Sequence, residues 1–178
     1  MRRKYARSLA SASRPQINNL EKAREYAFLL LKYRLRSEQE LLQRLKQKGF
    51  SEELCRDTVD FLKDRKFIDD RIFARGWVAS RLKRPFGLRR IKQELIQKGL
   101  DKEVIEDTLS RYRGQSQKSG QSPLEEDYDE GSILRRLAEQ RFSKLKGVEP
   151  LKARQRVYAY LMRRGFSPDL INSIVTKQ

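Results

Sequence analysis

The side chains in this chain that could do chemistry are mainly cationic. Between residues 71 and 93 the sequence carries eight Lys or Arg residues and no Asp or Glu. Guanidinium and ammonium groups recognise anions, and arginine binds phosphate or carboxylate groups through two parallel hydrogen bonds. This segment therefore predicts a binding site for an anionic partner rather than a reaction centre.

The residue types on which most enzymes depend are scarce or poorly placed. The chain has no histidine and one cysteine, Cys55, which excludes every Ser-His or Cys-His arrangement. Asp69 and Asp70 are adjacent, and the favoured interpretation is that one of them caps a helix. The acidic cluster at 125–130 lies in a segment rich in Gly, Ser and Gln, where carboxylates cannot be held around a metal ion. We expect no catalytic residue, no metal and no cofactor, and hence no enzyme.

The overall charge supports the same interpretation. The 178 residues include 41 Lys or Arg and 24 Asp or Glu, which gives a net charge of +17 and a pI near 10.2. Such an excess favours nucleic acid as the partner, ahead of an anionic membrane surface or an acidic protein. No apolar run approaches the roughly 20 residues that span a bilayer. Since a single cysteine also fits a reducing compartment, we expect a cytoplasmic protein with no membrane contact.

Three Lys-Gly or Arg-Gly pairs mark an internal repeat. Apolar residues four apart precede each pair and form one stripe of a helix. The glycine of the pair can adopt the left-handed conformation that ends a helix, and a Ser or Asp two residues later can cap the next one. The pattern predicts helix, tight turn, helix in each copy. The glycines are Gly49, Gly99 and Gly165, and the capping residues are Ser51, Asp101 and Ser167.

A further helix precedes each of these pairs, so we predict an all-α fold of three tandem three-helix units. The units lie near residues 21–67, 68–113 and 132–178. Since units below 50 residues bury too little apolar surface to be stable alone, we expect neighbours to pack into an extended, curved chain. Residues 1–20 are basic and predict a disordered tail. Residues 114–131 predict an acidic flexible linker, which would let the third unit move.

The start of the middle helix differs between the copies. In the first unit Ser37 precedes acids, which suits the positive end of the helix dipole. In the second unit Gly87 stands at the same position and precedes Arg89 and Arg90, and the third unit also has arginines there. Glycine offers no capping side chain, so free N–H groups beside two arginines predict an anion site. The alternative is an ordinary solvated helix face.

Two kinds of anion fit this surface, and we expect both. Nucleic-acid phosphates would give strongly salt-dependent binding, with log K falling by about 0.7 per log unit of salt for each phosphate on single strands and about 0.9 on duplex. Acidic patches of a partner protein would give a weaker dependence. The helix that follows each Gly turn is rather acidic, as in Ser51–Leu62, and would be repelled by the phosphates that line a groove. Sequence-specific reading of the major groove is therefore not expected. The candidate binding residues are Arg71, Arg75, Arg81, Lys83, Arg84, Arg89, Arg90, Lys92, Lys98, Arg154, Arg156, Arg163 and Arg164.

Three other side chains are assigned to packing or to the surface. Phe73 and Trp77 are four residues apart on an apolar stripe, which predicts a core position rather than base stacking. Phe86, between Pro85 and Gly87, is the better exposed aromatic residue. Cys55 occupies a position that isoleucine fills in the other two units, which predicts a small core residue rather than a nucleophile.

The segment FIDDRIFARGWVASRLKRPFGLRRIKQELIQKGLDKEVIEDTL resembles the central unit of the RecX family of recombination regulators. The segment RSEQELLQRLKQKGFSEELCRDTVDFLKDRKFIDD resembles the first unit of that family running into the second. The likeness covers about residues 21–112 and is weaker in the third unit, whereas the basic tail and the acidic linker depart from the family pattern. The resemblance implies tandem three-helix repeats, no catalysis, and binding in the groove of a RecA–single-stranded DNA filament.

We therefore predict a regulator of a RecA-type recombinase, and the resemblance favours inhibition. Its partners would be the recombinase filament and the backbones of single- and double-stranded DNA, and it would act as a monomer. The alternative is a general DNA-binding helical repeat protein without a recombinase partner.

Overall fold

The computed structural model describes residues 19–113 and 128–176. Within these ranges the chain forms nine helices and no strand, and none of the helices is long and apolar enough to cross a membrane. The helices are α1 (Leu20–Tyr33), α2 (Glu38–Lys48), α3 (Glu52–Asp64), α4 (Asp70–Leu82), α5 (Leu88–Gln97), α6 (Lys102–Arg113), α7 (Glu130–Ser143), α8 (Pro150–Arg164) and α9 (Pro168–Val175).

The helix ends are formed by the residues that the repeat predicts. The backbone φ angles of Gly49, Gly99 and Gly165 are 106°, 76° and 86°. This left-handed conformation is strained for residues with a side chain but not for glycine. Each glycine therefore ends the middle helix of its unit. The expected serine caps are also present: the hydroxyl oxygens of Ser37, Ser51 and Ser167 accept hydrogen bonds from the N–H groups of Glu40, Leu54 and Leu170.

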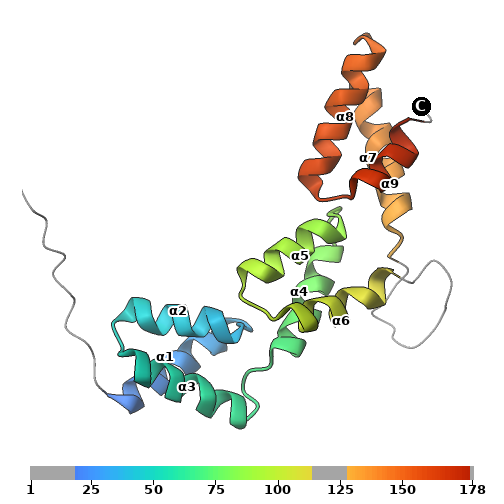
Figure 1. Cartoon of the computed structure of the whole chain (residues 1–178). Helices are drawn as coiled ribbons and strands as arrows, with labels where there is room; N and C mark the ends of the chain where they lie inside the picture. The colour runs from blue at the N-terminus through green and yellow to red at the C-terminus, as the bar shows by residue number, and fades with distance from the viewer. Residues whose placement is uncertain (1–18, 114–127, 177–178) are drawn as a thin grey trace, which may run out of the picture.

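The nine helices pack in three consecutive triplets, each around its own core. Figure 1 shows the triplets following one another in an extended, bent chain, as predicted, rather than gathering into one globule. Cys55 is fully buried and Phe73 is 3% exposed, so both core predictions are confirmed. Trp77 is half-buried and its ring stacks on that of Phe73 at 5.7 Å. The largest buried side chains include Leu41, Leu45 and Leu62 in the first unit, Ile91, Leu95 and Leu109 in the second, and Leu161, Phe166 and Ile171 in the third.

The two segments predicted to be disordered lie largely outside the described residues, and the described chain resumes at Tyr128. The Tyr128 side chain is 8% exposed and packs on the second unit beside Tyr112. Asp129 then caps α7 by accepting a hydrogen bond from the Gly131 N–H. The third unit thus begins two residues before the expected Ser132, because acids at the end of the predicted linker form the helix start.

Candidate nucleic-acid interface

Two joints connect the three units, and both follow the same plan. In each joint the start of one middle helix meets the end of the next middle helix along the chain (Figure 1). The first joint brings residues 37–40 at the start of α2 against Lys98 and Gly99. The second joint brings residues 87–90 at the start of α5 against Arg164 and Gly165.

The first joint is closed by two hydrogen bonds at the start of α2. The Ser37 hydroxyl donates to the carbonyl oxygen of Lys98 at 2.7 Å, and the Glu38 N–H donates to Asp70 Oδ1 at 3.0 Å. Burial raises the pKa of the Asp70 carboxyl, and the hydrogen bond from Glu38 opposes this effect. Of the two predicted cap residues, Asp69 is the cap of α4, with its carboxylate accepting from two backbone N–H groups. Asp70 is therefore free to hold the neighbouring unit.

The second joint repeats this arrangement with different residues. The Gly87 N–H donates to the carbonyl oxygen of Arg164 at 3.0 Å, and the Leu88 N–H donates to Glu130 Oε1 at 2.9 Å. Glu130 begins α7 as Asp70 begins α4. The Tyr128 hydroxyl also donates to the carbonyl oxygen of Phe86 at 2.9 Å. The third unit is thus bonded to the second at the start of α5.

These contacts contradict the prediction of free N–H groups at the first residue of α5, Leu88. A carboxylate of the chain itself, Glu130, already accepts the hydrogen bond of Leu88. The absence of a capping side chain at Gly87 has a steric cause instead. A Cβ atom there would lie 2.3 Å from the carbonyl oxygen of Gly165, and a Cβ on Gly165 would lie 2.2 Å from Cβ of Arg90. Glycine is required at positions 87 and 165 because the backbone at the start of α5 lies directly against the backbone at the end of α8.

This contact predicts that Gly87→Ala opens the second joint while the second unit stays folded. Gly87 has φ −75° and ψ 154°, which alanine adopts freely, so the damage is confined to the close approach. We expect an overpacking cost of about 1–3 kcal/mol to fall on the contact between the units. Small-angle scattering should show a larger radius of gyration, with unchanged helix content by circular dichroism.

Gly76→Ala is the matched control for this experiment. A Cβ at Gly76, inside α4, meets only Leu35 Cδ1 at 3.8 Å, an ordinary van der Waals distance. Alanine in a helix is favoured over glycine by about 1 kcal/mol, so this variant should be slightly more stable with the same radius. An unchanged radius in Gly87→Ala would contradict the steric explanation.

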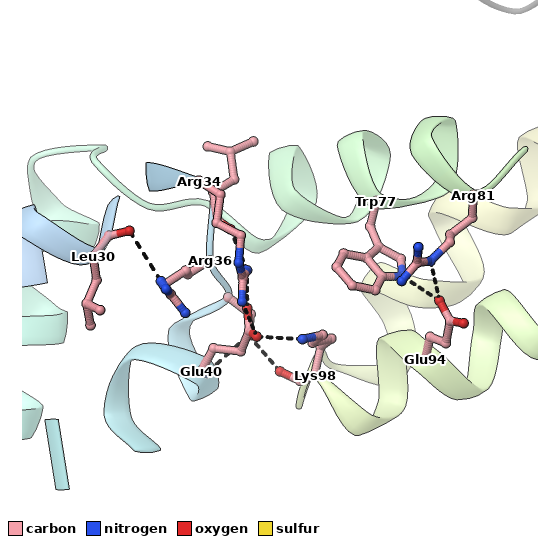
Figure 2. Close-up of polar contacts among 10 residues, drawn as sticks. Leu30, Arg34, Arg36, Glu40, Trp77, Arg81, Glu94 and Lys98 are labelled. Carbon is pink, nitrogen blue, oxygen red and sulfur yellow. Dashed lines mark hydrogen bonds and ion pairs between the residues drawn. The ribbon is translucent and has the colours of Figure 1, made fainter. Parts of the chain in front are cut away.

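Opposite charges neutralise each other in the first joint, as Figure 2 shows. The Glu40 carboxylate accepts two hydrogen bonds from Arg34 at 2.9 Å and one from Lys98 at 2.5 Å. Its side chain is only 13% exposed. Burial alone would raise the pKa of Glu40, but the hydrogen bonds from Arg34 and Lys98 outweigh it and hold that pKa at about 2.

The network continues from Lys98 into the second unit. The Lys98 ammonium lies 4.8 Å from the ring centre of Trp77, and the Arg81 guanidinium lies 4.3 Å from it. Glu94 accepts hydrogen bonds from Trp77 Nε1 at 3.1 Å and from Arg81 Nε at 2.6 Å (Figure 2). Burial raises the pKa of Glu94, but the hydrogen bonds from Arg81 and Arg90 outweigh it and leave the pKa low.

Like charges meet in the second joint. Arg90 occupies the position of Glu40, and Arg164 occupies that of Lys98. The guanidinium carbons of Arg90 and Arg164 lie 4.2 Å and 5.7 Å from the ring centre of Phe86, which is half-buried rather than freely exposed. Arg164 also lies 5.3 Å from the ring of Tyr160, at the same distance as Arg141 on the third unit. Arginines and aromatic rings therefore alternate across the joint.

The structure divides the predicted binding residues into paired and unpaired cations. Five form ion pairs within the described residues, so part of their charge is used in holding the fold: Arg71 with Glu103 and Asp107, Arg81 and Arg90 with Glu94, Lys92 with Glu106, and Lys98 with Glu40. Seven others are exposed and have no ion pair in the described part of the chain: Arg75, Lys83, Arg84, Arg89, Arg154, Arg156 and Arg163.

Four of the unpaired cations are next to the second joint in the sequence. Lys83 and Arg84 lie in the loop before it, Arg89 lies within it, and Arg163 precedes Arg164. Exposed cations without carboxylate partners are available to a polyanion at little desolvation penalty. The second joint is therefore the centre of the candidate interface. Lys98, by contrast, belongs to the first joint.

Three functional positions were missed by sequence reasoning. Glu130 and Asp70 hold neighbouring units, and Tyr128 fixes the loop before α5, although all three lie in segments that look like linkers or caps. Their signal is a comparison between copies: each is placed at or just before the first residue of a unit's first helix. Within the described residues, no group of three His, Cys, Asp or Glu is placed to hold a metal ion.

Three tandem three-helix units, joined end to end by the same kind of contact, define a helical repeat protein. Models of the first, second and third three-helix domains of RecX match residues 23–62, 69–109 and 128–175. The chain is 34% identical over 147 residues to the regulatory protein RecX of Chlorobium phaeobacteroides (strain BS1), covering 82% of this chain and 86% of that protein. The chain belongs to the RecX family of regulatory proteins.

Other comparisons agree with this assignment. The regulatory protein RecX of Clostridium botulinum (strain Eklund 17B / Type B) is 30% identical over 156 residues, which is 86% of this chain and 67% of that protein. The crystal structure of RecX from Lactobacillus salivarius superposes with a TM-score of 0.70 at 23% identity, covering 89% of this chain and 95% of the solved chain. That likeness supports the fold: a series of three-helix units.

Proposed function

We propose that this protein inhibits a RecA-type recombinase by binding the recombinase–single-stranded DNA filament through the second and third units. The observation that carries the proposal is the set of exposed, unpaired cations around the second joint and along α8. An extended chain of small units suits the groove of a filament, because each unit can contact a different stretch of it (Figure 1). The protein acts as a monomer and carries out no reaction itself.

A charged helical repeat protein without a recombinase partner is the second candidate. The net charge of +17 supports it equally well, because phosphate contacts alone give general DNA binding. Family membership favours the first candidate. The two differ in whether an effect persists when the salt concentration is high enough to suppress contacts with bare DNA.

The test is ATP hydrolysis and strand exchange by the recombinase on single-stranded DNA, with and without this protein. We expect both rates to fall when the protein is stoichiometric with, or scarcer than, the recombinase, at salt concentrations where binding to bare DNA is weak. No change at stoichiometric amounts would refute the proposal. A mobility shift of bare DNA at low salt, without any effect on the recombinase, would favour the second candidate.

A further inference from the structure

The two joints differ in charge at equivalent positions. Three residues at the first joint are acidic, whereas only one of the corresponding residues in the second joint is acidic. The first joint has Glu38, Glu40 and Asp70, and the second has Leu88, Arg90 and Glu130 in their places. Both joints keep a cation at the end of the following middle helix, Lys98 or Arg164. The first joint is neutralised from within the chain, and the second carries excess positive charge.

The missing group in the second joint is the carboxylate of Glu40. In the first joint that carboxylate bridges Arg34 and Lys98. In the second joint Arg90 and Arg164 face the same ring, Phe86, from two different units. Arg90 shares the carboxylate of Glu94 with Arg81, so that acid is already divided between two guanidinium groups. Because both guanidinium groups lie within 6 Å of one ring centre, their like charges repel each other unless an anion joins them.

We propose that the second joint binds a phosphate group of a nucleic-acid backbone between Arg90 and Arg164, in the place that the Glu40 carboxylate holds in the first joint. This phosphate holds the third unit on the second, so that nucleic acid fixes the geometry of the repeat chain. The inference deepens the proposed function and rests on it. It does not depend on the N–H groups at the start of α5, because Arg164 and Glu130 already accept those of Gly87 and Leu88.

The Arg90 side chain is 42% exposed and therefore accessible, and its paired N–H donors match the oxygens of either a phosphate or a carboxylate. The surrounding charge favours a phosphate of a nucleic acid over a carboxylate of a protein. The exposed cations Lys83, Arg84 and Arg89 continue the positive surface along a backbone that repeats its charge.

The test uses amide hydrogen exchange by NMR on the full chain, because the Gly87 and Leu88 N–H groups bridge the two units. A single-stranded deoxythymidine oligomer is the probe, and inorganic phosphate and an oligoglutamate peptide are compared with it. If binding closes the joint, the exchange rate of both amides falls by a factor of 1 + [L]/Kd, about tenfold at roughly ten dissociation constants of oligomer. The Glu38 N–H in the first joint should not respond.

Two variants separate the charge from the fold. Arg90→Glu restores the acid of the first joint, so the two amides should exchange slowly without ligand and no longer respond to the oligomer. Arg90→Gln removes the charge and should lose the response without closing the joint. Arg56→Glu is the control, because Arg56 is exposed on α3 of the first unit, which takes no part in the second joint. Its response should equal that of the unaltered protein.

The outcomes distinguish this inference from the proposed function. If the oligomer and the recombinase filament bind but the Gly87 and Leu88 amides do not respond, the phosphate site is wrong and the proposed function stands. If only oligoglutamate slows the exchange, the partner is an acidic protein and the inference is overturned. An unchanged oligomer response in Arg90→Glu would also overturn it. If neither the oligomer nor the filament binds, both proposals fail.

Discussion

Replacing Glu40 by Gln is expected to lower the free energy of unfolding by about 2 kcal/mol at neutral pH. The pKa of this carboxyl falls from 4.5 to about 2 in the folded chain because Arg34 and Lys98 hydrogen-bond to it. That difference corresponds to about 3 kcal/mol, and partial screening of the pair by solvent reduces the value we expect. Glutamine keeps the size and one acceptor oxygen but loses the charge, and so leaves two cations without their anion.

The pH dependence of this effect has a defined direction. Because the folded pKa of Glu40 lies below its unfolded value, its contribution is complete above about pH 4.5. It is lost as the pH falls from about 4.5 to about 2, where the folded form also becomes protonated. Urea unfolding of both proteins at pH 7, 4 and 2.5 should therefore show a difference that is largest at pH 7 and falls to about a quarter of that value at pH 2.5.

Glu52→Gln is the control for the charge itself. Glu52 also contacts two cations, Lys46 at 3.2 Å and Arg56 at 2.7 Å, but its side chain is 59% exposed. Exposed pairs contribute little, so this variant should unfold nearly as the unaltered protein does. If Glu52→Gln were as destabilising as Glu40→Gln, the loss would come from net charge and not from the joint.

Local structure could be predicted from the sequence because its causes lie within a few residues. A left-handed glycine such as Gly49 and a capping serine such as Ser51 act on their own turn, and the apolar stripes recur with the helical period. The three-unit, all-α fold follows from these signals and from their repetition. A cap at Asp69 or Asp70 is predictable for the same reason, and the structure assigns it to Asp69.

The joints could not be predicted because their causes lie in a neighbouring unit. Gly87 looks like a missing cap in the sequence, but its lack of a side chain is required by the backbone of Gly165, 78 positions further on. In the sequence Lys98 resembles any basic residue at a helix end, and only the structure shows its hydrogen bond to Glu40. The apolar periodicity predicts which face of a helix is buried, but it does not predict which helix ends of neighbouring units are in contact.

The exposed cations just before and at the start of α5 should carry much of the binding to nucleic acid. Reversing three exposed cations in Lys83→Glu/Arg84→Glu/Arg89→Glu should weaken binding to a single-stranded deoxythymidine oligomer by more than tenfold at low salt. Each lost phosphate contact reduces the slope of log K against log salt by about 0.7, so three contacts reduce it by about 2. None of the three has an ion pair in the described part of the chain, so the fold should be kept. Fluorescence anisotropy at several salt concentrations measures both quantities.

A second triple variant tests whether binding depends on the position of these charges or only on the net charge. A control with the same change in net charge reverses Lys22, Arg44 and Arg56, three exposed cations of the first unit (Lys22→Glu/Arg44→Glu/Arg56→Glu). If the second joint is the interface, the control keeps the salt slope of the unaltered protein, and its affinity falls only through the weaker long-range field. Equal losses in both variants would show that net charge alone attracts the nucleic acid, with no preferred face. A retained slope in the variant at residues 83, 84 and 89 would instead place the interface elsewhere, and the unpaired cations of α8, Arg154 and Arg156, would be the next residues to reverse.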